Sequence, residues 1–210
     1  MMDAKHLLLY AVTDRRWLKG RSLAEDVEAA LMGGATMIQL REKEMDTEAF
    51  IVEARQIKKV TDRFGVPLII NDRIDVCLAV DAAGVHVGQS DMQAGKVRDL
   101  IGPDRILGVT AKTVDQAKAA KAAGADYLGS GAVFGSSTKK DALSMSKELL
   151  ARITASVDIP VVAIGGVDAG NILQLQGLGL AGAAIVSGIF AQPDIRRAAE
   201  RLHELCLQIV

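Results

Sequence analysis

The sequence has few cysteines, no apolar run long enough to cross a bilayer, and no excess of charge of either sign. Its 210 residues include 25 basic and 26 acidic side chains, for a net charge of −1. Nucleic-acid binding requires a basic surplus against the phosphates, so we expect no such partner. A membrane helix needs about 20 apolar residues, so we expect no membrane partner either. Half of the residues are apolar, which is typical of a globular domain.

Only two cysteines are present, Cys77 and Cys206, far apart and each in an apolar stretch. This pattern predicts buried free thiols and a reducing, cytoplasmic location. The first residues show no signal-peptide apolar region separate from the first predicted strand, in line with that location.

Short apolar, β-branched runs alternate along the whole chain with segments of helical period. The predicted strands are 7–12, 37–41, 67–70, 84–87, 105–109, 126–131, 160–164 and 183–187. The clearest helix is 47–64, whose predicted buried face comprises Phe50, Ile51, Ala54, Ile57, Val60 and Phe64. A last helix, 195–209, places Ala198, Leu202, Leu205 and Ile209 on one stripe.

Strands that alternate with helices require a parallel sheet. Eight such units in this length predict an α/β fold, a compact single-domain (β/α)8 TIM barrel over residues 1–210. The alternative is an open doubly wound sheet, but Thr13–Arg16 follows the first strand where a Gly-x-Gly-x-x-Gly fingerprint would stand. No linker, low-complexity tract or internal repeat interrupts the chain.

Glycine-rich turns follow the last two predicted strands. Gly165-Gly166 follows 160–164, and Ser187-Gly188 follows 183–187. Barrels of this type often bind a phosphate at that place, on backbone N–H groups and hydroxyls. The alternative is that the glycines only allow tight turns. Because the second turn repeats the pattern, we predict a phosphate site.

Cations and carboxylates follow the second, third and fourth strands. Gln39, Arg41 and Lys43 alternate and so share an orientation, which suits an anion; the alternative is a solvated charge run. Asp72 and Asp91 follow neighbouring strands and suit Mg²⁺. The alternatives are an ion pair of Asp72 with a nearby arginine (Arg73 or Arg41) and a helix N-cap at Asp91 before 92–101.

A polar loop follows the sixth predicted strand and runs from Phe134 to Asp141. Its hydroxyls and lysines suit a segment that wraps a phosphate and closes over a substrate. The alternative is a solvated loop without a binding role.

The motifs in this order resemble thiamine-phosphate synthases over almost the whole chain. They are Tyr10–Asp14, Ile38–Lys43, Asn71–Arg73, Gly84–Asp91, Ser137–Asp141 and Ala163–Gly166. The resemblance implies a (β/α)8 barrel that, with Mg²⁺, joins 4-amino-5-hydroxymethyl-2-methylpyrimidine diphosphate to a thiazole phosphate, free or carboxylated. Diphosphate is released. These small molecules are the implied partners, and the oligomeric state, including a homo-oligomer, is left open.

The resemblance also implies roles for individual residues. Those matching pyrimidine-diphosphate contacts are Gln39, Arg41, Lys43, Asn71, Thr110 (where the family usually has serine) and Lys139. Those matching the thiazole-phosphate site are Ser136, Ser137, Thr138, Gly166, Val186 and Ser187. Asp72 and Asp91 match the Mg²⁺ ligands. Arg41, Lys43 and Lys139 would act in catalysis, by stabilising charge on the leaving diphosphate. The sixth-strand loop departs from the family pattern, with Ala132 in place of proline and Ser136 in place of threonine.

Two rival activities share this fold. A thiazole tautomerase would need a base and no diphosphate–Mg²⁺ site; its pattern lacks both aspartates and has a histidine after the fifth strand, where this chain has Lys112. A non-catalytic barrel that binds a phosphorylated ligand is the other alternative. His86, in the middle of the fourth strand, fits either a core histidine or a substrate contact.

Overall fold

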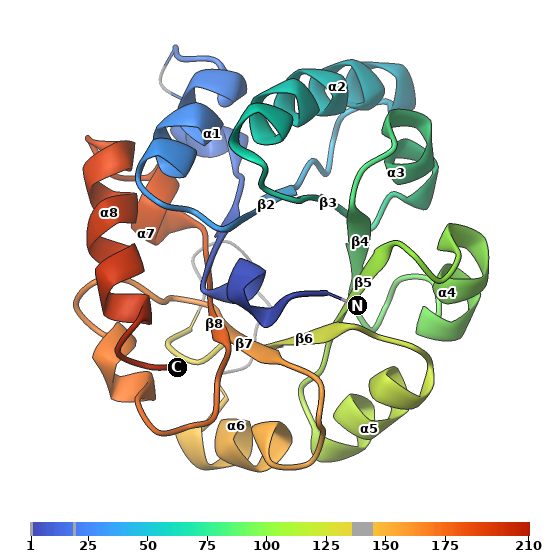
Figure 1. The fold of residues 1–210 in the computed structure, drawn as a ribbon, viewed down its shortest axis with the longest axis vertical. Helices are drawn as coiled ribbons and strands as arrows, with labels where there is room; N and C mark the ends of the chain where they lie inside the picture. Colours follow the sequence, from blue (N-terminus) through green and yellow to red (C-terminus); the bar gives the residue numbers. More distant parts are fainter. Residues whose placement is uncertain (1, 19, 136–144) are drawn as a thin grey trace.

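The computed structural model describes residues 2–18, 20–135 and 145–210. Eight parallel strands form a closed barrel in the order β1 to β8, which confirms the predicted fold (Figure 1). The strands are β1 (Leu9–Val12), β2 (Met37–Leu40), β3 (Leu68–Asn71), β4 (Gly84–Val87), β5 (Ile106–Thr110), β6 (Tyr127–Gly131), β7 (Val161–Ile164) and β8 (Gly182–Ile185). Each lies within two residues of its predicted bounds.

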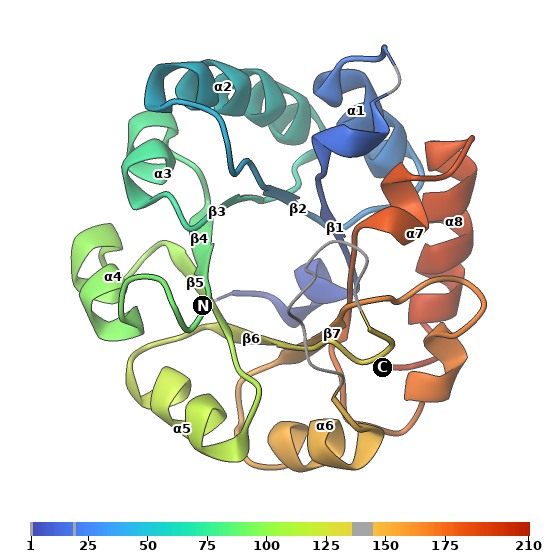
Figure 2. The same ribbon diagram turned by 180° about the vertical axis from the view of Figure 1, so that it is seen from behind.

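The helices surround the barrel on the outside, as Figures 1 and 2 show from its two ends. They are α1 (Leu23–Met32), α2 (Thr47–Phe64), α3 (Ile74–Val80), α4 (Ala94–Ile101), α5 (Val114–Ala122), α6 (Lys147–Thr154), α7 (Ser187–Phe190) and α8 (Ile195–Cys206). Three 3-10 turns complete the described elements: η1 (Ala4–Leu7), η2 (Arg15–Trp17) and η3 (Ile172–Leu175). Within the described residues no helix is long and apolar enough to cross a membrane.

The sheet separates two apolar layers. Alternate strand residues point inward and form a small interior cluster, to which Leu7 of η1 also belongs. The larger layer lies between the outer face of the sheet and the helices. Cys77 and Cys206 lie in that outer layer, buried and unpaired, as predicted. Burial raises the pKa of Cys77 to about 11 and that of Cys206 to about 12, so both remain thiols.

Helix α2 shows how local sequence fixes an element. The Asp46 side chain accepts a hydrogen bond from the N–H of Ala49 at its start, and Gly65 ends it with a left-handed φ of 65°. Phe50 is fully buried, as predicted. The prediction was wrong for Phe64, which is 38% exposed. Phe64 is the last residue of the helix, and Thr61, one turn earlier, fills the buried position.

Helix α8 also differs in detail from its prediction. Ala199 is fully buried while Ala198 is half-buried, so the stripe is shifted by one residue at its start. The helix ends at Cys206. Ile209 remains buried although it lies beyond the helix end.

Replacing Phe50 by alanine is expected to lower the free energy of unfolding by about 3–5 kcal/mol, because the substitution leaves a cavity in the packed layer between sheet and helices. Phe64→Ala is the matched control on the same helix. It should cost about 1 kcal/mol or less, since the ring already contacts solvent. Urea unfolding followed by circular dichroism measures both values. Equal losses would contradict this account of the α2 interface.

Candidate active site

A pocket opens at the carboxyl ends of the strands and gathers most of the predicted substrate residues. Those that line it are Gln39, Arg41, Asn71, Asp72, Thr110, Gly166, Val186 and Ser187. Lys43 and Asp91 do not line it, although each contacts a residue that does. Ser136, Ser137, Thr138 and Lys139 lie outside the described residues, so their predicted roles stay predictions. The pocket also contains Tyr10, His86 and Lys112.

Arg41 and Lys43 follow β2 and reach the pocket side of the barrel mouth. The Arg41 backbone N–H donates to Thr13 Oγ1 at 3.0 Å, which fixes the chain beyond the end of the strand. Lys43 Nζ forms an ion pair with the Asp72 carboxylate. The alternative of a solvated charge run does not hold for Arg41, which lines the pocket. Lys43 is paired with Asp72, yet its side chain is 48% exposed.

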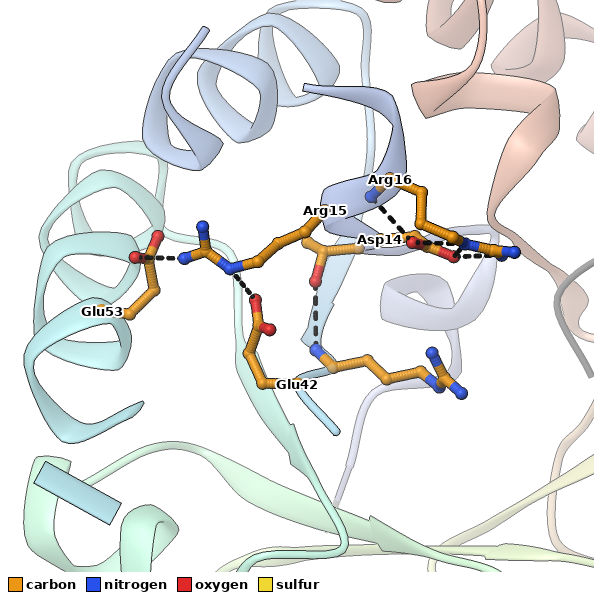
Figure 3. A network of polar contacts seen from close by, with 7 residues as sticks. Asp14, Arg15, Arg16, Glu42 and Glu53 are labelled. Carbon is orange, nitrogen blue, oxygen red and sulfur yellow. Dashed lines mark hydrogen bonds and ion pairs between the residues drawn. The ribbon is translucent and has the colours of Figure 1, made fainter. Parts of the chain in front are cut away.

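Glu42, between these two cations, turns the opposite way. Its Oε1 accepts from Arg15 Nε at 2.7 Å, and the Arg15 guanidinium also donates to Glu53 of α2 at 2.6 Å (Figure 3). The Glu42 side chain is only 7% exposed. Burial raises its pKa, while the charge and hydrogen bond of Arg15 act against that rise. Through Arg15 this clamp ties Glu42 to α2, and Glu42, unlike Arg41, does not line the pocket.

Asp14, after β1, places a second buried carboxylate near Arg41. Arg16 donates to both of its oxygens, from Nε to Oδ1 at 3.0 Å and from a terminal nitrogen to Oδ2 at 2.5 Å (Figure 3). Burial alone would raise the pKa of Asp14, but the hydrogen bonds and charge of Arg16, with the charge of Arg41, hold it below the usual value. Asp14 is thus kept ionised, and its charge acts on the Arg41 guanidinium.

Asp72 and Asp91 follow the adjacent strands β3 and β4. The Asp72 backbone has a left-handed φ of 61°, which is uncommon for an aspartate, and its N–H donates to the His86 carbonyl at 2.9 Å. The alternative ion pairs were wrong: the Asp72 partner is Lys43, while Arg73 pairs with Asp75. Strained backbone of this kind is often found at functional sites.

The Asp91 side chain does not cap a helix, so the N-cap alternative was wrong. Helix α4 begins at Ala94, and the Asp91 carboxylate instead accepts from the Gly88 N–H at 2.7 Å. Gly88 in turn lines the pocket. Among the described residues there is no group of three or more histidine, cysteine or acidic side chains that could enclose a metal. Two carboxylates at an open mouth fit a Mg²⁺ ion completed by substrate phosphate and water.

Gly165 and Gly166 both have left-handed backbones, with φ of 96° and 68°. A Cβ at Gly165 would lie 2.5 Å from Ala132, and one at Gly166 would lie 2.5 Å from the Phe134 carbonyl oxygen. Both positions therefore require glycine, because the β7 loop packs closely against the chain after β6. Their predicted phosphate contact remains a prediction. The Gly131–Ala132 peptide bond, in that neighbouring segment, is cis.

Asn71 and His86 are nearly buried, yet both line the pocket. The Asn71 Nδ2 has no hydrogen-bond partner among the described residues, which leaves a donor available to a ligand. His86 is hydrogen-bonded as a core histidine, to Tyr127 at 3.0 Å and to Thr110 at 3.0 Å. Its predicted substrate contact stays a prediction. Tyr127 was missed by the sequence reasoning. Its alternation with Gly129 and Gly131 along β6 was the available signal that it points inward.

The family model described as thiamine monophosphate synthase matches residues 9–189. The chain belongs to this family. It is 51% identical over 197 residues to the thiamine-phosphate synthase of Ruminiclostridium cellulolyticum, covering 94% of each chain. It is 49% identical over 201 residues to the thiamine-phosphate synthase of Clostridium beijerinckii, covering 96% of each. The structure of a thiamine phosphate pyrophosphorylase from Pyrococcus furiosus superposes with a TM-score of 0.91 at 36% identity, covering 99% and 98% of the two chains.

Membership of the thiamine monophosphate synthase family decides between the predicted activities. The chain is a transferase that makes thiamine phosphate, and both the synthase function and the barrel fold are confirmed. The tautomerase and the non-catalytic barrel are thereby set aside. A thiamine phosphate pyrophosphorylase structure from Bacteroides thetaiotaomicron, with a TM-score of 0.66 at 16% identity, shares the fold.

Proposed function

We propose that the pocket binds pyrimidine diphosphate on the side of β2 to β5 and thiazole phosphate on the side of β7 and β8. The first site comprises Gln39, Arg41, Lys43, Asn71 and Thr110, with Lys139 supplied from outside the described residues. The second comprises Gly166, Val186 and Ser187, with Ser136, Ser137 and Thr138. The observation that carries this proposal is that seven of these residues, together with Asp72, line one pocket.

The charges of the first site favour a diphosphate. Arg41 can hold two phosphate oxygens at once, and Lys43 adds a point charge beside Asp72. The pairing of Lys43 with Asp72 places one cation and one metal-ligating carboxylate in contact. Both can then serve the same phosphate group, Lys43 directly and Asp72 as a ligand of Mg²⁺.

Asp72 and Asp91 would hold Mg²⁺, which when bound neutralises charge on the diphosphate oxygens. For Asp91 this requires its carboxylate to exchange or share the Gly88 N–H bond it makes here. Two carboxylates leave most of the coordination to substrate and water, as is typical of magnesium.

The proposed reaction is a dissociative substitution. The bond from the pyrimidine methylene carbon to the diphosphate oxygen breaks, and its electron pair leaves with the diphosphate. The 4-amino group stabilises the resulting cation, and the thiazole nitrogen then donates its lone pair to form the C–N bond. No protein nucleophile is required. Arg41, Lys43 and Lys139 stabilise the developing negative charge, and the second site aligns the thiazole for attack.

We also propose a cytoplasmic location. Two buried, unpaired thiols support it, since such thiols are usual in a reducing compartment.

Binding of inorganic diphosphate, the released product, tests the first site without turnover. Calorimetric titration is expected to give at least about tenfold tighter binding with Mg²⁺ than with EDTA, because the metal offsets repulsion between the carboxylates and the ligand. Inorganic phosphate alone, which has fewer oxygens to share between Arg41 and the metal, is the comparison ligand. Equal affinity with and without Mg²⁺ would contradict the proposed metal site.

A further inference from the structure

A single chain of hydrogen bonds crosses the interior of the barrel beneath the pocket. Gln39 Nε2 donates to the Tyr10 hydroxyl at 2.6 Å, and that hydroxyl lies 2.7 Å from the Tyr127 hydroxyl. The Tyr127 hydroxyl lies 3.0 Å from His86 Nδ1, and His86 Nε2 lies 3.0 Å from Thr110 Oγ1. The chain thus begins and ends at proposed substrate contacts, Gln39 and Thr110.

Strands β5 and β6 leave room for two residues of this hydrogen-bond chain, Tyr127 and His86. Tyr127 is fully buried, and its ring lies 5.5 Å from that of His86, centroid to centroid. A Cβ on Gly108 would lie 2.3 Å from the Tyr127 hydroxyl and 2.5 Å from His86 Nδ1. A Cβ on Gly129 would lie 3.1 Å from His86 Cε1. The two glycines leave the space that this pair occupies, and larger residues there would displace it.

The direction of the hydrogen bonds follows from the donors. Burial raises the pKa of Tyr10 and of Tyr127, so each phenol keeps its single proton. The Gln39 amide nitrogen can only donate, so the Tyr10 oxygen accepts from it and the Tyr10 proton goes to Tyr127. The Tyr127 proton then goes to His86 Nδ1, which places the imidazole proton on Nε2, facing Thr110.

The opposite direction conflicts with the orientation of the Gln39 amide, whose Nε2 faces the Tyr10 hydroxyl. If Thr110 donated to His86, or if the imidazole carried both protons, Nδ1–H would donate to Tyr127 and Tyr127 to Tyr10. The Tyr10 proton would then face the Gln39 amide hydrogens across 2.6 Å. Two donors cannot share such a contact.

We propose that Tyr10, Tyr127 and His86 are positioning residues that make Thr110 a hydrogen-bond donor, and Gln39 an acceptor, toward the substrate. Because Thr110 Oγ1 accepts from His86 Nε2, its own proton is directed into the pocket, where an anionic diphosphate oxygen needs a donor. Because the Gln39 nitrogen is committed to Tyr10, its Oε1 is left to accept from an amino group. The roles of Thr110 and Gln39 toward the substrate rest on the proposed function. The direction of the hydrogen bonds does not.

Nitrogen NMR of the protein with ¹⁵N-labelled histidine tests the direction without substrate. The variants His6→Gln and His203→Gln remove the other two signals and so assign that of His86. At pH 8 we expect a neutral His86 protonated on Nε2. Tyr127→Phe should shift it toward a mixture of tautomers, while Tyr10→Phe should not, since Tyr127 can still donate to Nδ1. A proton on Nδ1, an imidazolium, or the same response to both variants would overturn the proposal.

A double-mutant cycle tests the consequence for catalysis. Tyr127→Phe should lower kcat/KM for the pyrimidine diphosphate about tenfold, as expected for one misdirected hydrogen bond to a charged group. In a Thr110→Val background the same change should have an effect of about twofold or less, because no hydroxyl remains to be directed. In a Thr110→Ser background the tenfold effect should return. Equal effects in all three backgrounds would show that Tyr127 acts only through packing.

Absence of thiamine phosphate formation by the folded wild-type protein would instead count against the proposed function. The NMR result would stand in that case.

Discussion

Replacing Asp72 by alanine is expected to lower kcat for thiamine phosphate formation about 10³-fold at equal folded fraction. The substitution removes a proposed metal ligand and leaves the Lys43 ammonium without its partner. Stabilisation of charge on a leaving group by one such component is worth roughly 10²–10³-fold, and here the metal and the lysine are both affected. Product formation under saturating Mg²⁺ and both substrates gives the measurement.

The backbone of Asp72 makes a specific control necessary. Alanine in a left-handed conformation costs about 1–2 kcal/mol, which could lower activity through stability alone. Asp81 has the same kind of backbone, with a φ of 52°, but ends α3 and pairs with Arg105. Asp81→Ala should therefore show a similar loss of stability with wild-type turnover. If both variants lose turnover equally, the effect at Asp72 comes from the backbone and not from the carboxylate.

Replacing Arg41 by alanine is expected to lower kcat about 10²-fold, the effect of removing one charged donor from a developing anion. Arg41 lines the pocket proposed to hold the diphosphate, and its backbone N–H is bonded to Thr13. Arg41→Lys should recover part of the loss, since it keeps the charge and loses the planar fork. Single-turnover kinetics at saturating substrate separates this loss from weaker binding.

Arg63 offers a control for Arg41. It is exposed on α2 and pairs with Glu28 of α1, away from the mouth. Arg63→Ala should leave kcat within about twofold of wild type, as most surface changes do. Wild-type turnover in Arg41→Ala at equal folded fraction would remove Arg41 from the mechanism.

Much of the site could be predicted because it depends on local order along the chain. Parallel strands expose their carboxyl ends at one edge, so Arg41, Asn71 and Asp72 had to meet once the barrel closed. The sequence shows these charged and polar residues directly at or after the end of each predicted strand. The same logic placed Gly166 and Ser187 in the pocket.

The features of the site that the sequence did not predict depend on contacts between segments far apart in the chain. The Tyr10–Tyr127 contact joins β1 to β6 across the interior, which requires the stagger of the closed barrel and not the pattern of either strand. The Arg15–Glu42–Glu53 clamp likewise joins two loops and a helix through long side chains. The N-cap alternative for Asp91 was wrong because the loop after β4 turns back on Gly88 before α4 begins.

The most direct test of the proposed metal and diphosphate site is the rate of thiamine phosphate formation as Mg²⁺ is titrated into metal-free enzyme, for wild type and Asp72→Asn. Asparagine tolerates the left-handed backbone and removes only the charge. Wild type should show no turnover in EDTA and saturable recovery with Mg²⁺, whereas the variant should need far more Mg²⁺ or fail to recover. Turnover that EDTA leaves unchanged, or identical Mg²⁺ dependence in the two proteins, would contradict the account.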